Sequence, residues 1–435
     1  MTPMVVVGAG LAGAEAAYQL AAHGVPVTLF EARPQATTPA HQTDQFAELV
    51  CSNSLGSEVK GTAKGLLVAE LEACDSMIVR LARATVVPAG MALAVDRHRF
   101  AAAVTEELAA MPGVTIRREI VDRLPEGPAI VATGPLTIDP LAQDLARLSG
   151  REYLHFYDAT SPIVDGGSID REIAFMANRR SEGVGDYLNC PLNEDEYRRF
   201  LDALLAAELV TPHGFEDKSV FEGCMPIEQI ARRGEATLRF GPMRPVGLDD
   251  PRTGRWPFAV VQLRREDAAG EMWNLVGFQT RMKFGAQREV LRLIPGLENA
   301  EFLRYGVIHR NTYVDGPRVL EPDLSLKDRP NVWLAGQITG VEGYLESVGM
   351  GLLAAHSALG RPSGWEAPPE TTMLGALVRY VTQSEPAPIQ PMNANFGLLP
   401  HPGRKMPKRD RKIFYHERGV KDLQAWYEAV CQHPH

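Results

Sequence analysis

Residues 4–34 have the sequence MVVVGAGLAGAEAAYQLAAHGVPVTLFEARP, and this stretch decides the fold. An apolar run, Met4–Val7, predicts a buried strand, and the alanine-rich segment after the glycine turn predicts a helix that ends at Gly24. A second apolar run, Val27–Phe30, predicts another strand and ends on Glu31. Strand, turn, helix, strand and acid follow one another as in a dinucleotide-binding unit. The stretch therefore predicts a Rossmann-like α/β domain.

Each glycine of the turn has a physical role. Gly8 permits the tight turn, Gly10 lets the backbone approach a pyrophosphate, and Gly13 lets the helix pack on the strand. The helix N-terminus then presents free N–H groups and a positive dipole end to the pyrophosphate. Glu31 lies at the distance expected of an acid that binds a ribose 2′-hydroxyl, which favours FAD or NAD over NADP. The predicted cofactor contacts here are Gly8, Ala9, Gly10, Leu11, Ala12, Gly13, Glu31 and Arg33.

Composition narrows the class of protein. The 435 residues can bury a large core and are enough for two domains. The net charge of -9 argues against electrostatic wrapping of nucleic acid, although a local basic patch remains compatible with it. The five cysteines are scattered without a CxxC pair, which predicts no disulfide framework, no metal site and a reducing compartment. No apolar run has membrane-spanning length and no signal segment precedes the first strand, so we expect a cytoplasmic protein.

The order of the predicted elements suggests one domain inserted into another. From about Tyr153 the chain is predicted to form a region of mixed strands and helices. Residues 302–309 and 331–336 are expected to return to the first sheet. We predict an α/β protein with a Rossmann-like FAD-binding domain of the two-dinucleotide-domain flavoprotein type and a smaller α+β insertion domain. The FAD-binding domain would comprise residues 1–152 and residues 302–435, and the second of these parts would contain a basic C-terminal tail. The insertion domain would comprise residues 153–301.

A second glycine-rich motif, GQITGVEGY at residues 336–344, follows a predicted strand. We expect it to open a helix that runs to about Leu359, with the helix N-terminus directed at the pyrimidine end of a flavin. Gln337 would hydrogen-bond ribityl or phosphate oxygens without adding charge. The predicted cofactor contacts in this motif are Gly336, Gln337, Gly343 and Tyr344.

Cys51 lies in the segment LVCSNSLGS, residues 49–57. Small hydroxyl and amide residues around a cysteine suit a loop that closes over a cofactor, and Asn53 and Ser54 are candidate cofactor contacts. A buried structural cysteine before a turn is the other interpretation. Both remain open from the residues alone.

Cys224 lies in the segment FEGCMPIEQIARRG, residues 221–234. Its Gly and Pro neighbours, with Arg232 and Arg233 shortly after, are compatible with a thiol pKa lowered toward a reactive thiolate. Equally, the arginines could be a solvated pair and the cysteine a packed one. RNA contact by the two arginines is a further hypothesis.

The C-terminal region contains a concentrated basic run in an otherwise acidic chain. Arg404, Lys405, Lys408 and Arg409 stand a few residues before the aromatic pair Phe414-Tyr415. Contact with RNA phosphates and a solvated helix face both agree with this pattern.

Five motifs, in this order, carry a family resemblance: GAGLAGAEAA, VCSNSLGS, FEGCMPIEQIARRG, LAGQITGVEGYLESVGMG and NANFGLLP. With them the chain resembles, over essentially its whole length, the FAD- and folate-dependent tRNA (uracil-5-)-methyltransferases, which methylate the T-loop uridine of bacterial tRNA. The resemblance implies FAD, 5,10-methylenetetrahydrofolate as carbon donor, NADH or NADPH as reductant, and the T-arm of tRNA as partner. It implies that Cys224 and Cys51 are catalytic and that His309 stacks on the folate pterin.

The implied chemistry is consistent with the residue types. C5 of uracil becomes nucleophilic only after a group adds at C6, and a thiolate is suited to that addition. Methylenetetrahydrofolate carries its carbon at the formaldehyde level, so a methyl group needs two further electrons, which reduced FAD can supply. We assign Cys224 to C6 and Cys51 to the flavin-side carbon-transfer or proton steps, with the exchanged assignment left open.

Three other classes of protein share some features of this sequence with the tRNA methyltransferases. The related enzymes that build carboxymethylaminomethyl groups on wobble uridines share the glycine motif and a GYLE-like segment, but they carry an added helical C-terminal domain. A nicotinamide-dependent oxidoreductase acting on a small substrate would need a second complete GxGxxG and would not need a basic tail. An RNA-binding flavoprotein without catalysis would not explain two cysteines in such settings.

Overall fold

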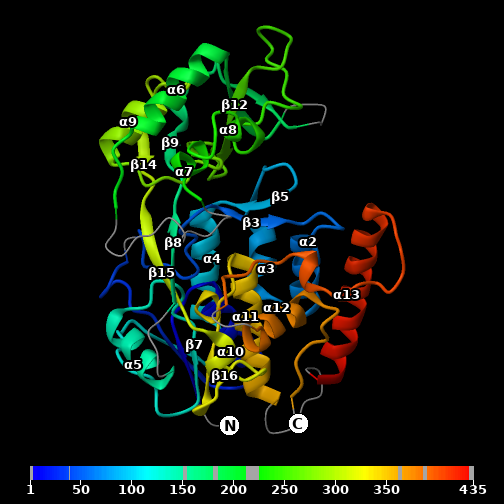
Figure 1. Ribbon diagram of the computed structural model, residues 1–435. Coiled ribbons are helices and arrows are strands. Elements are labelled where there is room, and N and C mark those ends of the chain that lie inside the picture. The colour runs from blue at the N-terminus through cyan, green and yellow to red at the C-terminus, as the bar shows by residue number, and fades with distance from the viewer. Residues whose placement is uncertain are drawn as a thin grey trace.

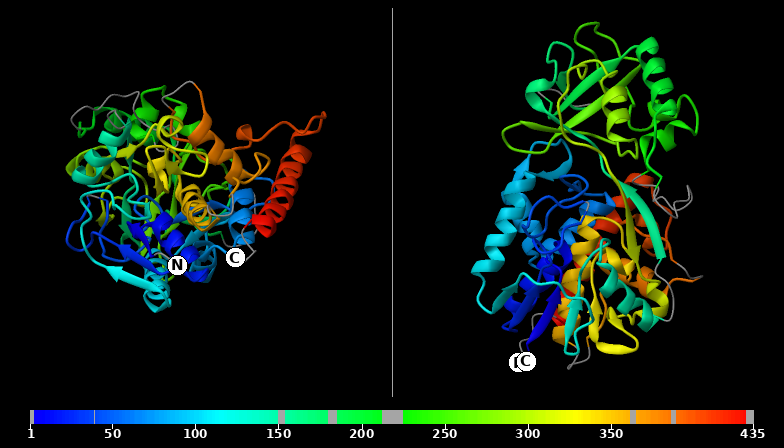
Figure 2. Two further views of the ribbon diagram at one scale, coloured as in Figure 1. Left: turned by 90° about the horizontal axis from the view of Figure 1, so that it is seen from below. Right: turned by 90° about the vertical axis from the view of Figure 1, so that its left-hand side faces the viewer.

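The computed structural model describes residues 3–38, 40–149, 154–179, 185–211, 225–360, 365–385 and 389–430. In Figure 1 the chain forms two bodies, a larger lower one near both termini and a smaller upper one. Figure 2 shows the same division from the side, with two long strands running between the bodies.

The larger body is built on a six-stranded sheet with the order β16-β17-β7-β1-β2-β6. β1 pairs in parallel with β2 on one side and with β7 on the other, and β16 alone is antiparallel. Central strands with layers on both faces are apolar throughout, as in MVVV and AIV. The strands are β1 Met4–Val7, β2 Val27–Phe30, β6 Val114–Arg117, β7 Ala129–Val131, β16 Ser325–Leu326 and β17 Arg329–Leu334. The predicted Rossmann-like α/β domain is confirmed.

Glycines allow the first helix to pack closely against the end of β1 and against α11. A Cβ at Gly13 of α1 (Leu11–Ala22) would lie 1.8 Å from the Gly8 carbonyl oxygen. A Cβ at Gly351 of α11 (Tyr344–Gly360) would lie 2.1 Å from the Ala12 carbonyl oxygen. The role predicted for Gly13, close packing of helix on strand, is confirmed.

The remaining elements of the larger body cover this core. A small sheet of order β3-β5-β4 lies between it and the smaller body (Figure 1). The fully buried Glu70 accepts hydrogen bonds from the Met373 and Leu374 amides at the start of α12, and burial raises its pKa to about 8. The elements are β3 Ser54–Ser57, β4 Val86–Val87, β5 Ala92–Val95, α2 Ala63–Ala73, α3 Met77–Ala84, α4 Arg97–Ala110, α5 Asp139–Ser149, α10 Gly316–Val319, α12 Met373–Gln383 and α13 Lys408–Val430.

The smaller body has its own antiparallel sheet, of order β10-β11-β12-β13-β9-β14, and its own apolar core around Trp273, Tyr197 and Phe200. The capping box predicted at Asn193 and Glu196 is present at the start of α6. Residues 302–309 were expected to return to the parallel sheet, and this was wrong. The strands are β9 Ile163–Asp165, β10 Phe175–Ala177, β11 Tyr187–Leu192, β12 Ala259–Arg265, β13 Met272–Leu275 and β14 Phe302–Arg304, and the helices are α6 Glu194–Ala206, α7 Ile227–Ala231, α8 Thr237–Phe240 and α9 Phe284–Leu291.

The reason for that error is pairing between distant strands. β14 (Phe302–Arg304) pairs with β9 of the smaller body, and β15 (Ile308–Tyr313) pairs with β8 (Leu154–Ala159) in a separate two-stranded ladder. This ladder connects the two bodies (Figure 1). The division at 152/153 and 301/302 stays a prediction, and the pairing of β14 favours a second boundary after Arg304.

A buried ion pair also joins the bodies. Arg97 at the start of α4 donates to Glu266 of the smaller body, with a distance of 2.7 Å between Nη2 and Oε2. The same guanidinium donates to the Leu49 carbonyl oxygen at 2.6 Å. The loop that contains Cys51 is therefore held at the junction of the bodies.

Candidate active site

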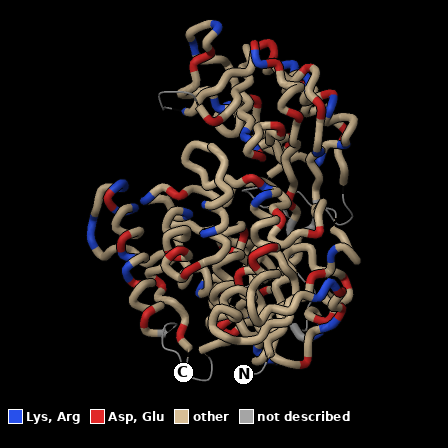
Figure 3. The backbone as a smooth tube through the Cα atoms, turned by 180° about the vertical axis from the view of Figure 1, so that it is seen from behind, with Lys and Arg blue, Asp and Glu red and all other residues tan. Residues whose placement is uncertain are grey.

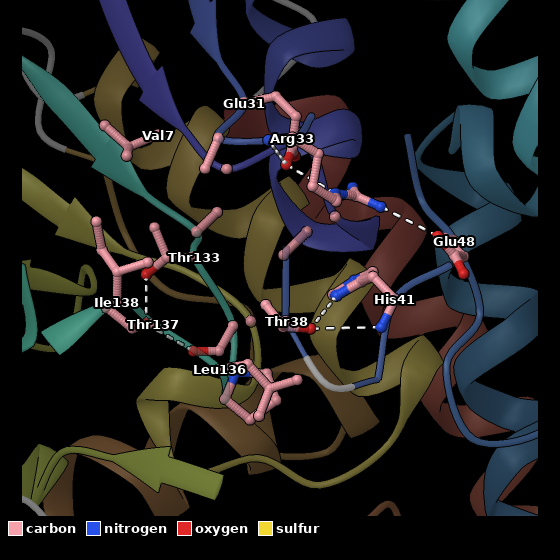
Figure 4. Close-up of a pocket in the computed structure, with 18 of the residues that line it drawn as sticks. Val7, Glu31, Arg33, Thr38, His41, Glu48, Thr133, Leu136, Thr137 and Ile138 are labelled. Atoms are coloured by element: carbon pink, nitrogen blue, oxygen red, sulfur yellow. Dashed lines mark hydrogen bonds and ion pairs between the residues drawn. The ribbon is translucent and has the colours of Figure 1, made fainter. Parts of the chain in front are cut away.

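A cleft opens at the carboxyl ends of the parallel strands. Many of its lining residues follow β1, β2, β7 and β17, which is where open α/β sheets bind their ligands. Figure 4 shows Glu31, Arg33, His41 and Thr133 around it. Of the predicted cofactor residues, those that line the cleft are Gly8, Gly10, Leu11, Ala12, Glu31, Arg33, Gly336, Gln337 and Tyr344.

The glycine turn leaves space above the N-terminus of α1. Gly10 is the N-cap residue, no side chain caps the helix, and a Cβ at Gly10 would meet no atom within 4 Å. Gly8 has a φ of 95°, and a Cβ there would lie 2.7 Å from the Ala132 carbonyl oxygen. The free N–H groups of α1 thus face an open space suited to a pyrophosphate. Ala9 and Gly13 shape the turn without lining the cleft.

Glu31 is held as an ionised acceptor. Its carboxylate accepts from the Ala9 amide at 3.0 Å and from Arg33 Nε at 2.8 Å, and Arg33 reaches on to Glu48 at 3.2 Å (Figure 4). Burial alone would raise the pKa of Glu31, but the hydrogen bonds and charge of Arg33 outweigh it and lower that pKa. A carboxylate in this position can accept from ribose hydroxyls.

The motif after β17 has the predicted order of strand, glycine-rich turn and helix: a 3₁₀ turn spans Gln337–Thr339, and α11 runs from Tyr344 to Gly360. The turn depends on glycine, since Gly336, Gly340 and Gly343 all have positive φ. Gly343 does not line the cleft, and a Cβ there would meet Glu346 Oε2 at 2.3 Å.

Gln337 already has a protein partner. Its amide nitrogen donates to Glu342, and it lines the cleft. Burial and the nearby charge of Asp158 raise the pKa of Glu342 well above its usual value. The side-chain oxygen of Gln337 is the atom with which it could bind a ligand.

Cys51 lies where the cleft meets the connecting ladder. The amides of Cys51 and Ser52 donate to the Tyr344 hydroxyl at 2.8 and 3.1 Å, and Tyr344 lines the cleft. The Cys51 sulfur lies 3.9 Å from the Ala159 carbonyl oxygen at the end of β8. The loop is therefore fixed by an α11 side chain and directed at the ladder.

The other predicted residues of this loop have structural partners. The fully buried Asn53 donates to the Val95 and Arg265 carbonyl oxygens, both at 2.8 Å, and accepts from Arg264 at 2.9 Å. The Ser54 hydroxyl accepts from the Gly56 amide at 3.2 Å. Neither residue lines the cleft, so a cofactor contact from Asn53 would have to use its backbone.

Cys224 lies outside the described residues, as does the side chain of His309. The backbone of His309 pairs with Asp158, next to Ala159. Ile227, at the start of α7, donates to the Gln279 carbonyl oxygen at 2.7 Å, and the adjoining Thr280 amide lies 3.3 Å from the Thr160 carbonyl oxygen. The end of β8 thus contacts the Cys51 loop and Thr280.

The predicted RNA-binding residues fall into two separate groups. Arg232 and Arg233 are exposed after α7 in the smaller body. The basic tail, defined as Arg404, Lys405, Lys408 and Arg409, is exposed at the start of α13 in the larger body. Figure 2 shows α13 at the rim of that body, and Figure 3 shows basic residues along it with acidic ones between them.

The sequence profile described as "Glucose inhibited division protein A" matches residues 3–365. The chain is 52% identical over 428 residues to the Anoxybacillus flavithermus "Methylenetetrahydrofolate--tRNA-(uracil-5-)-methyltransferase TrmFO", covering 98% of this chain and 99% of that protein. A protein of the same name from Desulforudis audaxviator is 53% identical over 429 residues, covering 97% and 98%. The chain belongs to this methyltransferase family.

Solved structures agree on the fold of this family member. Aquifex aeolicus GidA superposes with a TM-score of 0.69 at 18% identity, covering 98% of this chain and 77% of that one. A second crystal form of the same protein gives a TM-score of 0.66 at 18% identity, covering 98% and 75%. At this identity the likeness concerns the fold alone.

Several lining residues of this family member were missed by sequence reasoning. His41 contacts the Thr38 hydroxyl at 2.6 Å, and burial, with the nearby Arg33 charge, lowers the pKa of His41 to about 4. Thr133 and Thr137 share a 2.6 Å hydroxyl contact after β7. The glycine of Ala132-Thr133-Gly134 after β7 is a signal that could have found the two threonines, whereas residues 40–48 form a loop without periodicity and give no signal for His41.

Within the ranges that the structure describes, no group of three His, Cys, Asp or Glu side chains is arranged to hold a metal ion. Among the helices of those ranges, none is both long and apolar enough to cross a membrane.

Proposed function

We propose that this chain methylates C5 of the T-loop uridine in tRNA, taking the carbon from 5,10-methylenetetrahydrofolate and the electrons from NADH or NADPH through FAD. Membership of the methyltransferase family supports folate-dependent methylation of tRNA uracil. One observation carries the proposal: the Cys51 loop is fixed by Tyr344 at the edge of the cleft, with its sulfur against the strand that pairs with His309.

The cleft fits FAD in three respects. The open space above α1 accepts a pyrophosphate, the ionised Glu31 accepts from ribose, and Gln337 and Tyr344 remain for the ribityl and ring end. Bound FAD supplies the two electrons that reduce the transferred carbon to a methyl group.

The two cysteines divide the chemistry on the uracil ring. The Cys224 thiolate forms a bond to C6, and the displaced electron pair makes C5 the nucleophile that bonds to the one-carbon unit. The C5 proton then leaves to a base, and the bond between the one-carbon unit and its carrier nitrogen breaks. Two electrons and a proton, which reduced FAD would supply, convert that carbon to a methyl group, and the sulfur–C6 bond then breaks, which restores the ring and the thiolate. Cys51 serves the flavin-side carbon-transfer or proton steps. Arg232 and Arg233, exposed close to Cys224 in sequence, supply positive potential for RNA.

An isotope experiment tests the carbon source. With T-arm RNA, NADH and methylenetetrahydrofolate labelled in the methylene group, we expect the label in 5-methyluridine on nucleoside analysis. Labelled S-adenosylmethionine should give no labelled product, because the proposed electrons and carbon both come from other donors. Transfer from S-adenosylmethionine without folate or reductant would refute the proposal.

The basic tail provides a test of RNA binding. Replacing Arg404, Lys405, Lys408 and Arg409 with Ser should weaken T-arm binding and make the slope of log affinity against log salt shallower by about 3, if each residue contacts one phosphate. NADH-driven flavin reduction should not change, since the tail lies on α13, outside the cleft. Unchanged affinity at physiological salt would assign the tail to a solvated helix face.

A further inference from the structure

Three aromatic rings form a stacked column where the smaller body meets the connecting ladder. The rings of Phe284 and Tyr305 have centroids 4.9 Å apart and planes at 18°, and those of Phe302 and Tyr305 are 5.3 Å apart at 15°. Tyr305 is therefore the middle ring. Phe284, at the outer end, is 56% exposed. The column therefore ends in an aromatic side chain that is more than half exposed.

The column is held in place by a buried amide. Gln287 Nε2 donates to the Met282 and Gly306 carbonyl oxygens at 2.7 and 2.8 Å, and its Oε1 accepts from the Gly306 amide at 2.8 Å. These bonds tie the start of α9 to the residue after Tyr305. Because the rings are positioned in advance, a partner that stacks on them would lose little of its binding energy to ordering the protein.

The column lies beside the candidate active site. Gly306 leads to Val307, whose amide donates to the Thr160 hydroxyl at 3.0 Å. Thr160 follows Ala159, the contact of the Cys51 sulfur, and its carbonyl oxygen meets Thr280, four residues before Phe284. The same crossing at the end of β8 thus joins the column to the Cys51 loop and, through Thr280 and Gln279, to the start of α7.

The surroundings of Phe284 suit a flat aromatic partner that carries few charges close to the ring. Lys283 and Arg288 are exposed. Arg288 is one helical turn after Phe284, so the side chains of Phe284 and Arg288 project from the same face of α9. Glu208, which pairs with Lys283, and Glu289 keep the net charge small. Aromatic stacking, with modest help from phosphate contacts, is how proteins bind unpaired RNA bases.

We propose that Phe284 is a stacking platform for an unpaired base of the tRNA substrate, next to the target uridine. The inference rests on the proposed function and names a contact within it. A uridine attacked at C6 must leave its stack, so a neighbouring base loses a stacking partner. The exposed ring of Phe284 replaces that partner.

The test compares ring chemistry at one position in the full-length, FAD-loaded protein. Phe284→Leu keeps an apolar side chain without the ring and should raise the Kd for T-arm RNA about tenfold. Phe284→Trp should bind at least as tightly as the unmodified protein. The slope of log affinity against log salt should stay the same in both variants, because stacking releases no counterions, whereas the basic-tail variant should change it. Fluorescence anisotropy gives both quantities.

Phe240→Leu is the matched control, since Phe240 is 82% exposed in the same body and should leave the Kd unchanged. Flavin absorbance and the melting temperature of each variant show that the fold is intact. A Kd of the Phe284→Leu variant within twofold of the unmodified value would contradict the stacking role of Phe284 while leaving the proposed function in place. Weak binding by the Phe284→Trp variant would contradict it in the same way. A change in oligomeric state without a change in RNA affinity would identify the column as a contact between copies instead. An unmodified protein that bound no T-arm RNA would overturn both proposals.

Discussion

Gly10→Val is expected to give a folded protein that purifies without its yellow colour. A Cβ at this position meets no protein atom within 4 Å, so the valine side chain fits the protein but fills the space that a pyrophosphate would occupy. The overlap should weaken FAD binding about a hundredfold or more, which corresponds to a loss of about 3 kcal/mol. Flavin absorbance per mole of protein measures the loss, and circular dichroism measures the fold.

Gly13→Val is the matched control for this experiment. Its Cβ would lie 1.8 Å from the Gly8 carbonyl oxygen, so this substitution should damage the protein itself and lower its melting temperature. The two glycines of one turn should therefore separate ligand binding from folding. A Gly10→Val protein with full flavin absorbance would show that the cofactor's pyrophosphate does not lie over the start of α1.

The second large effect concerns the cysteines. Cys224→Ala should lose methylation by roughly 10³-fold or more, because the proposed nucleophile is gone. T-arm RNA with 5-fluorouridine at the target should trap a covalent adduct in the unmodified protein, since fluorine does not leave C5 as a proton does. Cys224→Ala should form no adduct and keep its FAD, and Cys51→Ala should lose methylation but still form some adduct. Mass spectrometry and the methylation assay report both outcomes.

Cys190→Ala is the control that should keep methylation. Cys190 is fully buried in β11, and burial raises the pKa of its thiol, which keeps it protonated and unreactive. If the RNA is found on Cys51, the roles of Cys51 and Cys224 are exchanged. If Cys190→Ala loses methylation as completely as Cys224→Ala, loss of activity does not identify the nucleophile and only the adduct does.

Short-range patterns account for what was predicted correctly. Residues 4–34 contain the whole βαβ unit, so neighbouring residues decide the strands, the turn and the helix end. The capping box of α6 is likewise complete within Asn193–Glu196. In such cases the partners of each hydrogen bond lie within a few residues, and the sequence displays them together.

The errors and omissions have a different cause. Phe302–Arg304 is a strand, as its composition suggests, but only pairing with β9 assigns it to the smaller body. Asn53 has the small amide side chain of a cofactor loop, yet its partners are Arg264 and Arg265 in β12. No local pattern contains such information, because the choice among distant partners depends on how the two bodies pack.

The sequence by itself determined the Rossmann-like domain, the glycine turn, the acid after β2 and, through its motifs, the family. Only the tertiary structure decided that Tyr344 fixes the Cys51 loop, that the end of β8 contacts both this loop and Thr280, and that Phe284 ends an aromatic column. The physical reason is distance along the chain. Hydrogen bonds and ring contacts between remote segments form only after the larger and smaller bodies have folded and docked, so the residues that make them carry no local signal of their partners.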